Sequence, residues 1–218
     1  MGTLAAVLLY FRRQLAVIVG AWFKSISGGP ATDESRLGWS LLLAAIPVAI
    51  AGLLAKGYIE EHLRNSPYAV AGALSFFGLL LWLADRLGRQ ILNETQVTWQ
   101  RALAIGVAQA LALFPGTSRS GIMMTAGLAL GFTRTAAARF SFLLAVPSIG
   151  MAGAYEGLEL LRSDQPIDWH SMVLGIVVSS LSGLVCIHYF LKLIQRAGML
   201  PFAVYRWVLA AVVIYALH

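Results

Sequence analysis

The sequence predicts an all-α membrane protein that crosses the bilayer several times. Of its 218 residues, 59% are hydrophobic and only 12% are charged, roughly half the charged fraction of a typical soluble domain. The mean hydropathy is +0.76, and the apolar residues gather in long runs. A helix needs roughly 20 mostly apolar residues to cross the hydrocarbon core. Six runs approach that length, at 2–22, 39–55, 68–84, 137–154, 170–191 and 200–217.

Short connections between these runs predict a single membrane domain over residues 1–218. Arg12 and Arg13 follow the first apolar residues instead of preceding them, which is unlike a cleavable signal peptide. The net charge of +6 is spread over loops between apolar runs, as the positive-inside rule predicts for a membrane protein. We therefore expect the bilayer as a partner and no nucleic acid.

A seventh apolar region, 102–132, differs because Pro115-Gly116 interrupts it near its centre. Each half has only about 14 residues, which suits a re-entrant hairpin better than a spanning helix. If the region returns to its own side, eleven Lys and Arg residues face that side and three face the other, with Arg119 and Arg206 inside apolar runs. The positive-inside bias favours this topology. We expect six transmembrane helices and one re-entrant helical hairpin.

This topology has the form of an inverted repeat. Three spans, a hairpin and three further spans make the second set run opposite to the first, as in many transporter folds. Residues 102–217 would hold a complete repeat, whereas residues 1–84 would hold three spans without a hairpin. We therefore expect an incomplete inverted-repeat architecture, and a segment that belongs before Met1 to be missing from this sequence.

The interruption in the hairpin has the residue types of a phosphate site. The N-terminus of the second short helix would present free N–H groups and the positive end of the helix dipole to an anion. Glycines allow a ligand to approach the backbone, hydroxyls donate hydrogen bonds, and arginine offers a planar fork that fits phosphate oxygens. These residues are Gly116, Thr117, Ser118, Arg119, Ser120 and Gly121.

A purely structural turn is the alternative, because Pro-Gly-Thr-Ser is ordinary turn chemistry. Arg119 argues against it, since a charged residue at membrane depth costs several kcal/mol unless it is paired or hydrated. Arg206 either reaches the headgroups or turns inward to a phosphate or a carbonyl. Gln109 either faces the same cavity or bridges helices.

The apolar runs lack the carboxylates that a metal-assisted phosphatase would need. No Asp or Glu lies inside an apolar run, although a metal-assisted phosphatase uses carboxylates to hold its cation. We therefore name no metal ligand in this chain.

Several stretches together resemble the undecaprenyl-diphosphate phosphatase family, also called the bacitracin-resistance family. The run Pro115-Gly-Thr-Ser-Arg-Ser-Gly121 resembles its second signature. Four further stretches match the same family: Tyr10–Arg13, Gly106–Phe114, Phe140–Pro147 and Pro201–Arg206. Two departures are visible. The family's first signature, a hairpin with two glutamates, lies upstream of the matched part, and Met123 stands where the family usually has threonine, with Thr125 two residues later.

The resemblance implies a multi-pass enzyme of the bacterial plasma membrane. Such an enzyme hydrolyses C55-isoprenyl diphosphate to the monophosphate and inorganic phosphate, which recycles the carrier lipid for peptidoglycan synthesis. It implies a divalent cation, Mg or Ca, an isoprenyl diphosphate lipid as ligand, and a possible homodimer. The implied catalytic residues are Ser118, Arg119 and Ser120, and the implied substrate-binding residues are Gly116, Thr117, Gly121, Thr125, Gln109 and Arg206.

Three hypotheses follow. The first is a phosphatase of this family whose sequence is truncated at its start. The second is a non-catalytic protein that binds or transports lipid phosphate, which the lack of intramembrane carboxylates motivates. The third is a half-enzyme that a partner completes.

Overall fold

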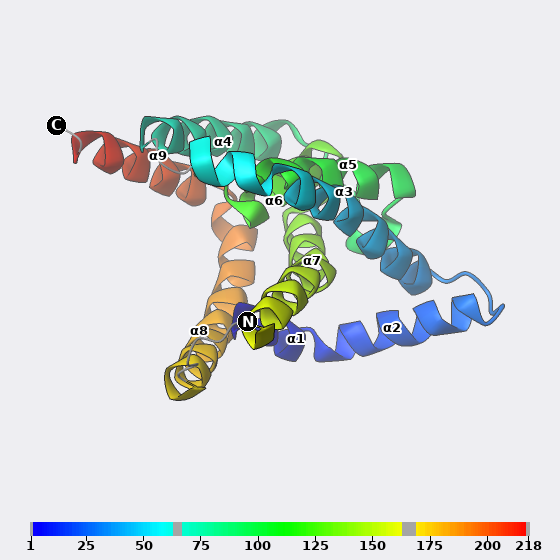
Figure 1. Cartoon of the computed structure of the whole chain (residues 1–218). Helices are drawn as coiled ribbons and strands as arrows, with labels where there is room; N and C mark the ends of the chain where they lie inside the picture. The colour runs from blue at the N-terminus through cyan, green and yellow to red at the C-terminus, as the bar shows by residue number, and fades with distance from the viewer. Residues whose placement is uncertain (1, 63–66, 163–168, 217–218) are drawn as a thin grey trace.

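The computed structural model describes residues 2–62, 67–162 and 169–216, and their secondary structure is almost wholly helical (Figure 1). The single β-bridge among these residues joins Leu92 and Phe132. The α-helices are α1 (Gly2–Tyr10), α2 (Arg12–Ile26), α3 (Asp33–His62), α4 (Pro67–Leu87), α5 (Trp99–Ala110), α6 (Arg119–Ala129), α7 (Arg134–Arg162), α8 (Trp169–Ala197) and α9 (Leu200–Tyr215). Two short 3-10 helices, η1 (Glu94–Gln96) and η2 (Leu111–Leu113), lie in the connections.

Four of the six expected spans are long apolar helices. They are Asp33–Leu54 within α3, Pro67–Leu87, Arg134–Tyr155 within α7, and Trp169–Ala197. Helix α9 is apolar but has only 16 residues, or about 24 Å at 1.5 Å per residue, which is less than the hydrocarbon thickness of roughly 30 Å. These helices make the chain a multi-pass membrane protein.

The apolar run 2–22 is not the continuous span that we expected. The chain turns by 80° between α1 and α2, with Phe11 at the break. The Arg12 side chain donates a 3.3 Å hydrogen bond to the Leu9 carbonyl, which would otherwise be unpaired at the end of α1. A hydropathy average over a window of residues does not report backbone direction, so the sequence did not predict this bend.

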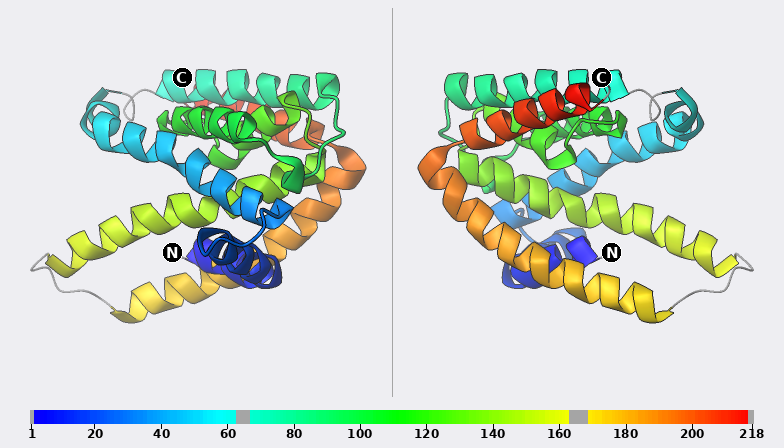
Figure 2. Two further views of the ribbon diagram at one scale, coloured as in Figure 1. Left: turned by 90° about the vertical axis from the view of Figure 1, so that its right-hand side faces the viewer. Right: turned by 90° about the vertical axis from the view of Figure 1, so that its left-hand side faces the viewer.

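Asp85 ties together the ends of four helices at one side of the molecule. It lies in the last turn of α4, and its carboxylate accepts hydrogen bonds from Arg134 Nε (2.6 Å) at the start of α7 and from the Met199 amide (3.0 Å) between α8 and α9. Close by, Glu94 accepts from Arg139 Nη1 at 3.1 Å and lies 3.5 Å from Gln14 Nε2 of α2. Figure 2 shows these helix ends gathered at one side, with the end of α7 and the start of α8 at the other.

We call this side the basic face, formed by residues 12–14, 85–94, 134–139 and 192–199. It joins the loops that the sequence assigned to one side of the membrane. On the expected opposite side, residues 63–66 and 163–168 lie outside the described residues, and so do the side chains of Lys56, Glu60, Glu61, Glu156 and Glu159.

Region 102–132 folds back on itself. The amides of Ile91 and Leu92 both donate to the Gly131 carbonyl at 3.0 Å, and the Thr133 amide donates to the Leu92 carbonyl at 2.9 Å. The residues that enter the region therefore lie beside those that leave it. Helices α5 and α6 pack against each other between these ends, as a hairpin requires.

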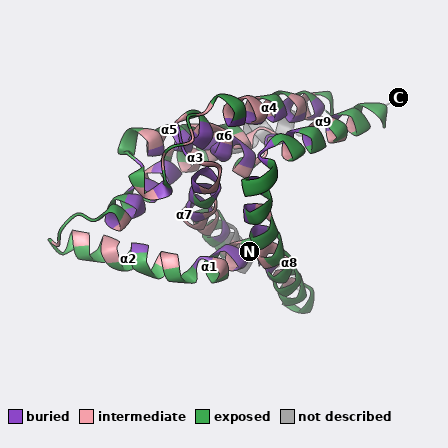
Figure 3. Ribbon diagram, turned by 180° about the vertical axis from the view of Figure 1, so that it is seen from behind, coloured by how far each residue is buried: buried purple, intermediate pink, exposed green. Residues whose placement is uncertain are grey.

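Small residues set the closest helix contacts. A Cβ on Gly106 of α5 would overlap the backbone of Ala44 in α3, and a Cβ on Gly183 of α8 would come within 2.8 Å of the Ala6 methyl group of α1. Membrane helices associate through such close backbone approach because lipid supplies no hydrophobic drive between them. Figure 3 shows the buried positions concentrated where α3 to α7 meet, while α8 is mostly exposed.

Candidate functional site

The turn between η2 and α6 is shaped by Gly116. This residue has φ +86°, a left-handed conformation that glycine adopts without steric cost. A Cβ at this position would lie 2.6 Å from the Val70 carbonyl oxygen of α4 and 3.1 Å from the Ala73 methyl group. The Thr117 amide closes the turn with a 3.1 Å hydrogen bond to the Phe114 carbonyl. The chain therefore reverses tightly against α4.

Ser118 begins α6 as its N-cap. Its φ and ψ are −67° and 123°, and its hydroxyl accepts a 3.2 Å hydrogen bond from the Gly121 amide. The Ser120 hydroxyl lies 3.4 Å from that of Ser118. The remaining free amides of the first turn of α6 give this end of the helix the positive potential that favours an anion.

Arg206 reaches this turn from the far end of the sequence. Its side chain is buried in α9 and donates from Nη2 to the Gly116 carbonyl (3.0 Å) and from Nε to the Leu74 carbonyl (3.3 Å). The sequence left open whether Arg206 reaches the headgroups or turns inward. In the structure it turns inward and bonds two backbone carbonyls. A Cβ on Gly121 would lie 3.5 Å from Arg206 Nη1, so this guanidinium borders the N-terminus of α6.

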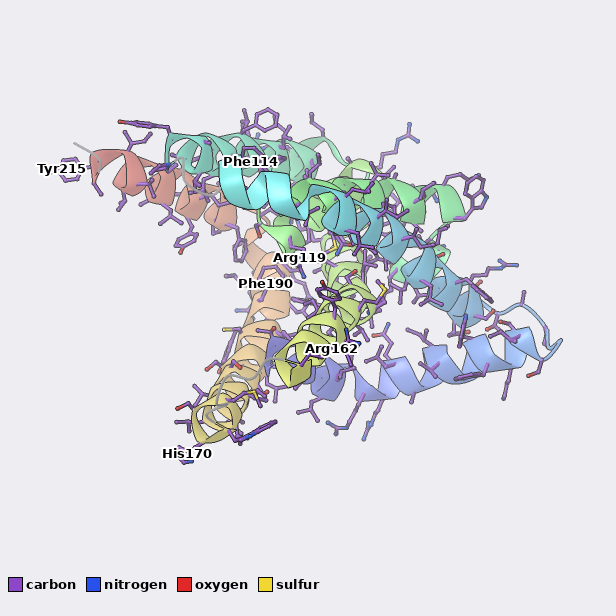
Figure 4. All side chains as sticks on the ribbon, in the orientation of Figure 1. Phe114, Arg119, Arg162, His170, Phe190 and Tyr215 are labelled. Atoms are coloured by element: carbon purple, nitrogen blue, oxygen red, sulfur yellow. The ribbon has the colours of Figure 1, made fainter. Side chains whose placement is uncertain are left out.

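Arg119 lies exposed at the start of the same helix. Figure 4 shows it where α6 begins, at the lower edge of the upper helix layer. Thr117 is 8% exposed, and within the described part of the chain its hydroxyl has no hydrogen-bond partner. The turn thus combines an exposed arginine, a buried arginine and an unpaired hydroxyl around one helix N-terminus.

Two expected substrate-binding residues have other contacts. The Thr125 hydroxyl donates 2.8 Å to the Gly121 carbonyl one turn earlier in α6. Gln109 is 0% exposed, and its Oε1 accepts a 3.4 Å hydrogen bond from Ser148 of α7. This hydrogen bond bridges α5 and α7, which is one of the two roles that the sequence left open for Gln109. The Nε2 atom of Gln109 has no hydrogen-bond partner among the described residues. Their roles toward a substrate stay predictions. Met123 is buried in the core.

An apolar pocket of about 510 Å³ adjoins the turn. It lies between α3, α4 and η2, and its lining includes Phe114, one residue before the Pro115-Gly116 reversal. Sequence reasoning missed it, although α4 carries small and aromatic residues at helical spacing. The lining residues are Ala51, Ala69, Gly72, Ala73, Phe76, Phe77, Ala110, Leu111, Leu113 and Phe114.

The described residues do not form a carboxylate site for a divalent cation. Within these ranges, no three His, Cys, Asp or Glu side chains lie close enough to hold a metal ion. The buried carboxylates of Asp85 and Glu94 are both paired with arginines at the basic face. Neither of these arginines belongs to the Gly116 turn. We therefore assign no reaction step to a metal held by these side chains.

Comparison with known proteins gives one consistent family. The model of the bacitracin resistance protein BacA family matches residues 1–212. Undecaprenyl-diphosphatase 1 of Pseudoalteromonas translucida is 53% identical over 208 residues, which cover 95% of this chain and 78% of that protein. Undecaprenyl-diphosphatase 2 of Stutzerimonas stutzeri is 50% identical over 217 residues, covering 98% and 80%. The undecaprenyl-diphosphatase of Nitrosococcus oceani is 50% identical over 215 residues, covering 99% and 81%.

Proposed function

The chain belongs to the bacitracin resistance protein BacA family, and on that basis we propose that it is a membrane phosphatase acting on a lipid diphosphate. The proposed substrate is C55-isoprenyl diphosphate, which is hydrolysed to the monophosphate and inorganic phosphate. The names of the three relatives support this substrate. We further propose that the enzyme lies in the bacterial plasma membrane and that Mg²⁺ or Ca²⁺ assists it.

One observation carries the proposal furthest: the lining of the apolar pocket includes Phe114 and Ala73, which adjoin the turn that we propose binds the diphosphate. The pocket reaches Phe114, and the N-terminus of α6 with Arg119 follows five residues later. An amphiphile with a diphosphate head and a hydrocarbon tail fits this arrangement, because each part meets surface of its own polarity. A soluble phosphate ester would leave the apolar pocket unused.

Hydrolysis adds water to the terminal phosphorus and breaks its bond to the bridging oxygen, which leaves with the lipid monophosphate. Negative charge grows on that bridging oxygen as the bond breaks. We propose that the Arg119 fork and the free amides of α6 stabilise this charge. Ser118 and Ser120 orient the terminal phosphate through their hydroxyls. Arg206 holds the Gly116 carbonyl, so that the turn keeps its shape as charge develops.

The decisive experiment measures phosphate release from C55- or C15-isoprenyl diphosphate by the purified chain, with Mg²⁺ or Ca²⁺ present. We expect release that falls by about 100-fold in Arg119→Ala, the size of effect seen when one transition-state donor is removed. Arg162→Ala is the matched control. Arg162 is also an exposed arginine, but it is the last residue of α7 and does not belong to the Gly116 turn.

Each outcome has a clear meaning. Release in the wild type that Arg119→Ala leaves unchanged contradicts the proposed site. No release, together with lipid diphosphate binding that needs Arg119, contradicts hydrolysis by this chain alone. That result favours the alternatives of a lipid-phosphate binder or a half-enzyme completed by a partner.

A further inference from the structure

Helix α2 is set crosswise to the helices that span the membrane. It follows α1 after an 80° bend, and Figure 2 shows it end-on while α7 and α8 are seen from the side. Its 15 residues extend about 22 Å, too little for a hydrocarbon core of roughly 30 Å. The helix therefore needs an explanation other than membrane crossing.

One side of α2 packs against α3. Ile18 is 3% exposed, and a Cβ on Gly38 of α3 would lie 3.3 Å from both Ile18 and Trp22. The Trp22 ring meets that of Trp39 edge-on, with centroids 5.5 Å apart. This contact fixes the rotation of α2 about its own axis.

The neighbouring side is an exposed apolar stripe. Val19, Phe23 and Ile26 are 46%, 58% and 54% exposed, and their spacing of four and three residues places them in one row. Ala16, also exposed, extends the row by one turn, and Arg12 stands at its start with Nη1 on the Leu9 carbonyl. Exposed apolar residues in a row, beside a buried side, indicate a second apolar environment.

A basic edge borders this stripe. Arg13 and Lys24 are exposed, and at 100° per residue they lie about 100° from the row of Val19 and Phe23. The sequence of α2 contains no acidic residue. Of the acids nearby, Asp33 pairs with Arg36 at 3.7 Å, and Glu34 lines a pocket with Arg13. Positive charge remains in excess, most clearly at Lys24.

The position of α2 fits this polarity. Gln14 lies 3.5 Å from Glu94, which is itself bonded to Arg139 of α7. The start of α2 therefore lies at the basic face, beside the carboxylate that pairs with Arg139 near the start of α7.

From these observations we infer that α2 lies in the headgroup layer of the leaflet at the basic face. Its stripe of Ala16, Val19, Phe23 and Ile26 dips into the acyl boundary, while Arg13 and Lys24 bind anionic phospholipid headgroups. Amphipathic helices with a basic polar edge bind lipid surfaces in this way.

Fluorescence quenching in nanodiscs tests this placement. Bimane is attached at Phe23→Cys, or at Lys24→Cys as the matched position, in a Cys186→Ser background that removes the chain's one native cysteine. At position 23 we expect quenching by shallow doxyl-labelled phospholipid and weak quenching by aqueous iodide. At position 24 we expect the reverse order.

Three results would overturn the inference. Equal iodide quenching at both positions would place the stripe in water. Shielding of position 23 from both quenchers would mean that protein covers it, either another segment or a second copy. Lipid quenching that is unchanged between pure phosphatidylcholine and nanodiscs containing phosphatidylglycerol would remove the role of anionic headgroups.

The charge is tested separately with Arg13→Gln/Lys24→Gln, leaving the stripe intact. We expect the double variant to retain lipid quenching at position 23 but to lose its increase with phosphatidylglycerol. Arg162→Gln, at the far end of α7, is the control and should keep the increase. Phosphatase activity of these variants is a separate readout, so failure of the proposed function leaves this test intact.

Discussion

The guanidinium of Arg206 donates a 3.0 Å hydrogen bond to the carbonyl of Gly116, 90 residues earlier in the sequence. The same side chain bonds the Leu74 carbonyl of α4 at 3.3 Å. The guanidinium of Arg206 in α9 thus bonds both the turn and α4 through their backbone carbonyls. This relationship makes Arg206 a positioning residue for the turn.

Replacing Arg206 with Met should lower kcat/KM by about 10- to 100-fold, because hydrogen bonds to a charged group contribute about 1.5–3 kcal/mol. Arg206→Lys should recover part of the activity, since an ammonium keeps the charge but cannot fork to two carbonyls. Phosphate release and thermal stability are measured together. Full activity in a folded Met variant would show that the Arg206 hydrogen bonds do not act on the site.

Gly116→Ala should abolish most activity. Alanine is strained at φ +86°, and its methyl group would press on the Val70 carbonyl. Gly150→Ala is the matched control, because among the described residues no heavy atom lies within 4 Å of that Cβ position apart from the chain neighbours and the adjacent helix backbone. The control should keep activity and stability in a thermal unfolding assay. A fully active Gly116→Ala enzyme would contradict the turn geometry.

Gly72→Leu should fill the apolar pocket, since Gly72 lines it and a Cβ there meets no described neighbour within 4 Å. The expected result is a KM for C55-isoprenyl diphosphate raised by about tenfold, or roughly 1.4 kcal/mol, with a smaller change for a short-chain substrate. Gly52→Leu, equally open but outside the pocket lining, should leave KM unchanged. An equal change of KM in Gly72→Leu and Gly52→Leu would mean that the isoprenyl tail does not bind in this pocket.

Asp85→Asn should destabilise the fold by about 1.5–3 kcal/mol, because it weakens charge-assisted hydrogen bonds to Arg134, whose side chain is 33% exposed. Asp33→Asn removes an exposed pair with Arg36 and should cost about 1 kcal/mol or less. Denaturation in detergent micelles measures both. If the two variants unfold alike, the Asp85 junction does not hold the helix ends together.

Much of the site could be predicted from local sequence. The interruption at Pro115-Gly116 and the short helix after it were expected, and the structure adds that Ser118 caps α6 and that Gly116 has a positive φ. The fit to a phosphate followed from residue types within seven positions. The roles of Ser118, Arg119 and Ser120 in catalysis stay predictions, as does the inverted-repeat division into 1–84 and 102–217.

Other features depend on residues far apart in the sequence. The run 2–22 has the hydropathy of one span, yet the chain bends at Phe11, because Arg12 pairs with the end of α1 and the Ile18 side of α2 packs on α3. The sequence also left open whether Arg206 faces headgroups or the interior. Its buried position between Leu74 and Gly116 required the packing of α9 on α4.

By itself, the sequence determined the helical membrane class, the charge bias of the loops and the chemistry of the 115–121 turn. These properties depend on hydropathy, on charge and on backbone preferences over a few residues, which act wherever the segment lies. Only the tertiary structure decided that Asp85 bonds the ends of several helices, that Arg206 bonds the turn and that an apolar pocket lies beside it. Such relationships arise from contacts across 49 to 132 residues, and the packing of whole helices determines which of these contacts form.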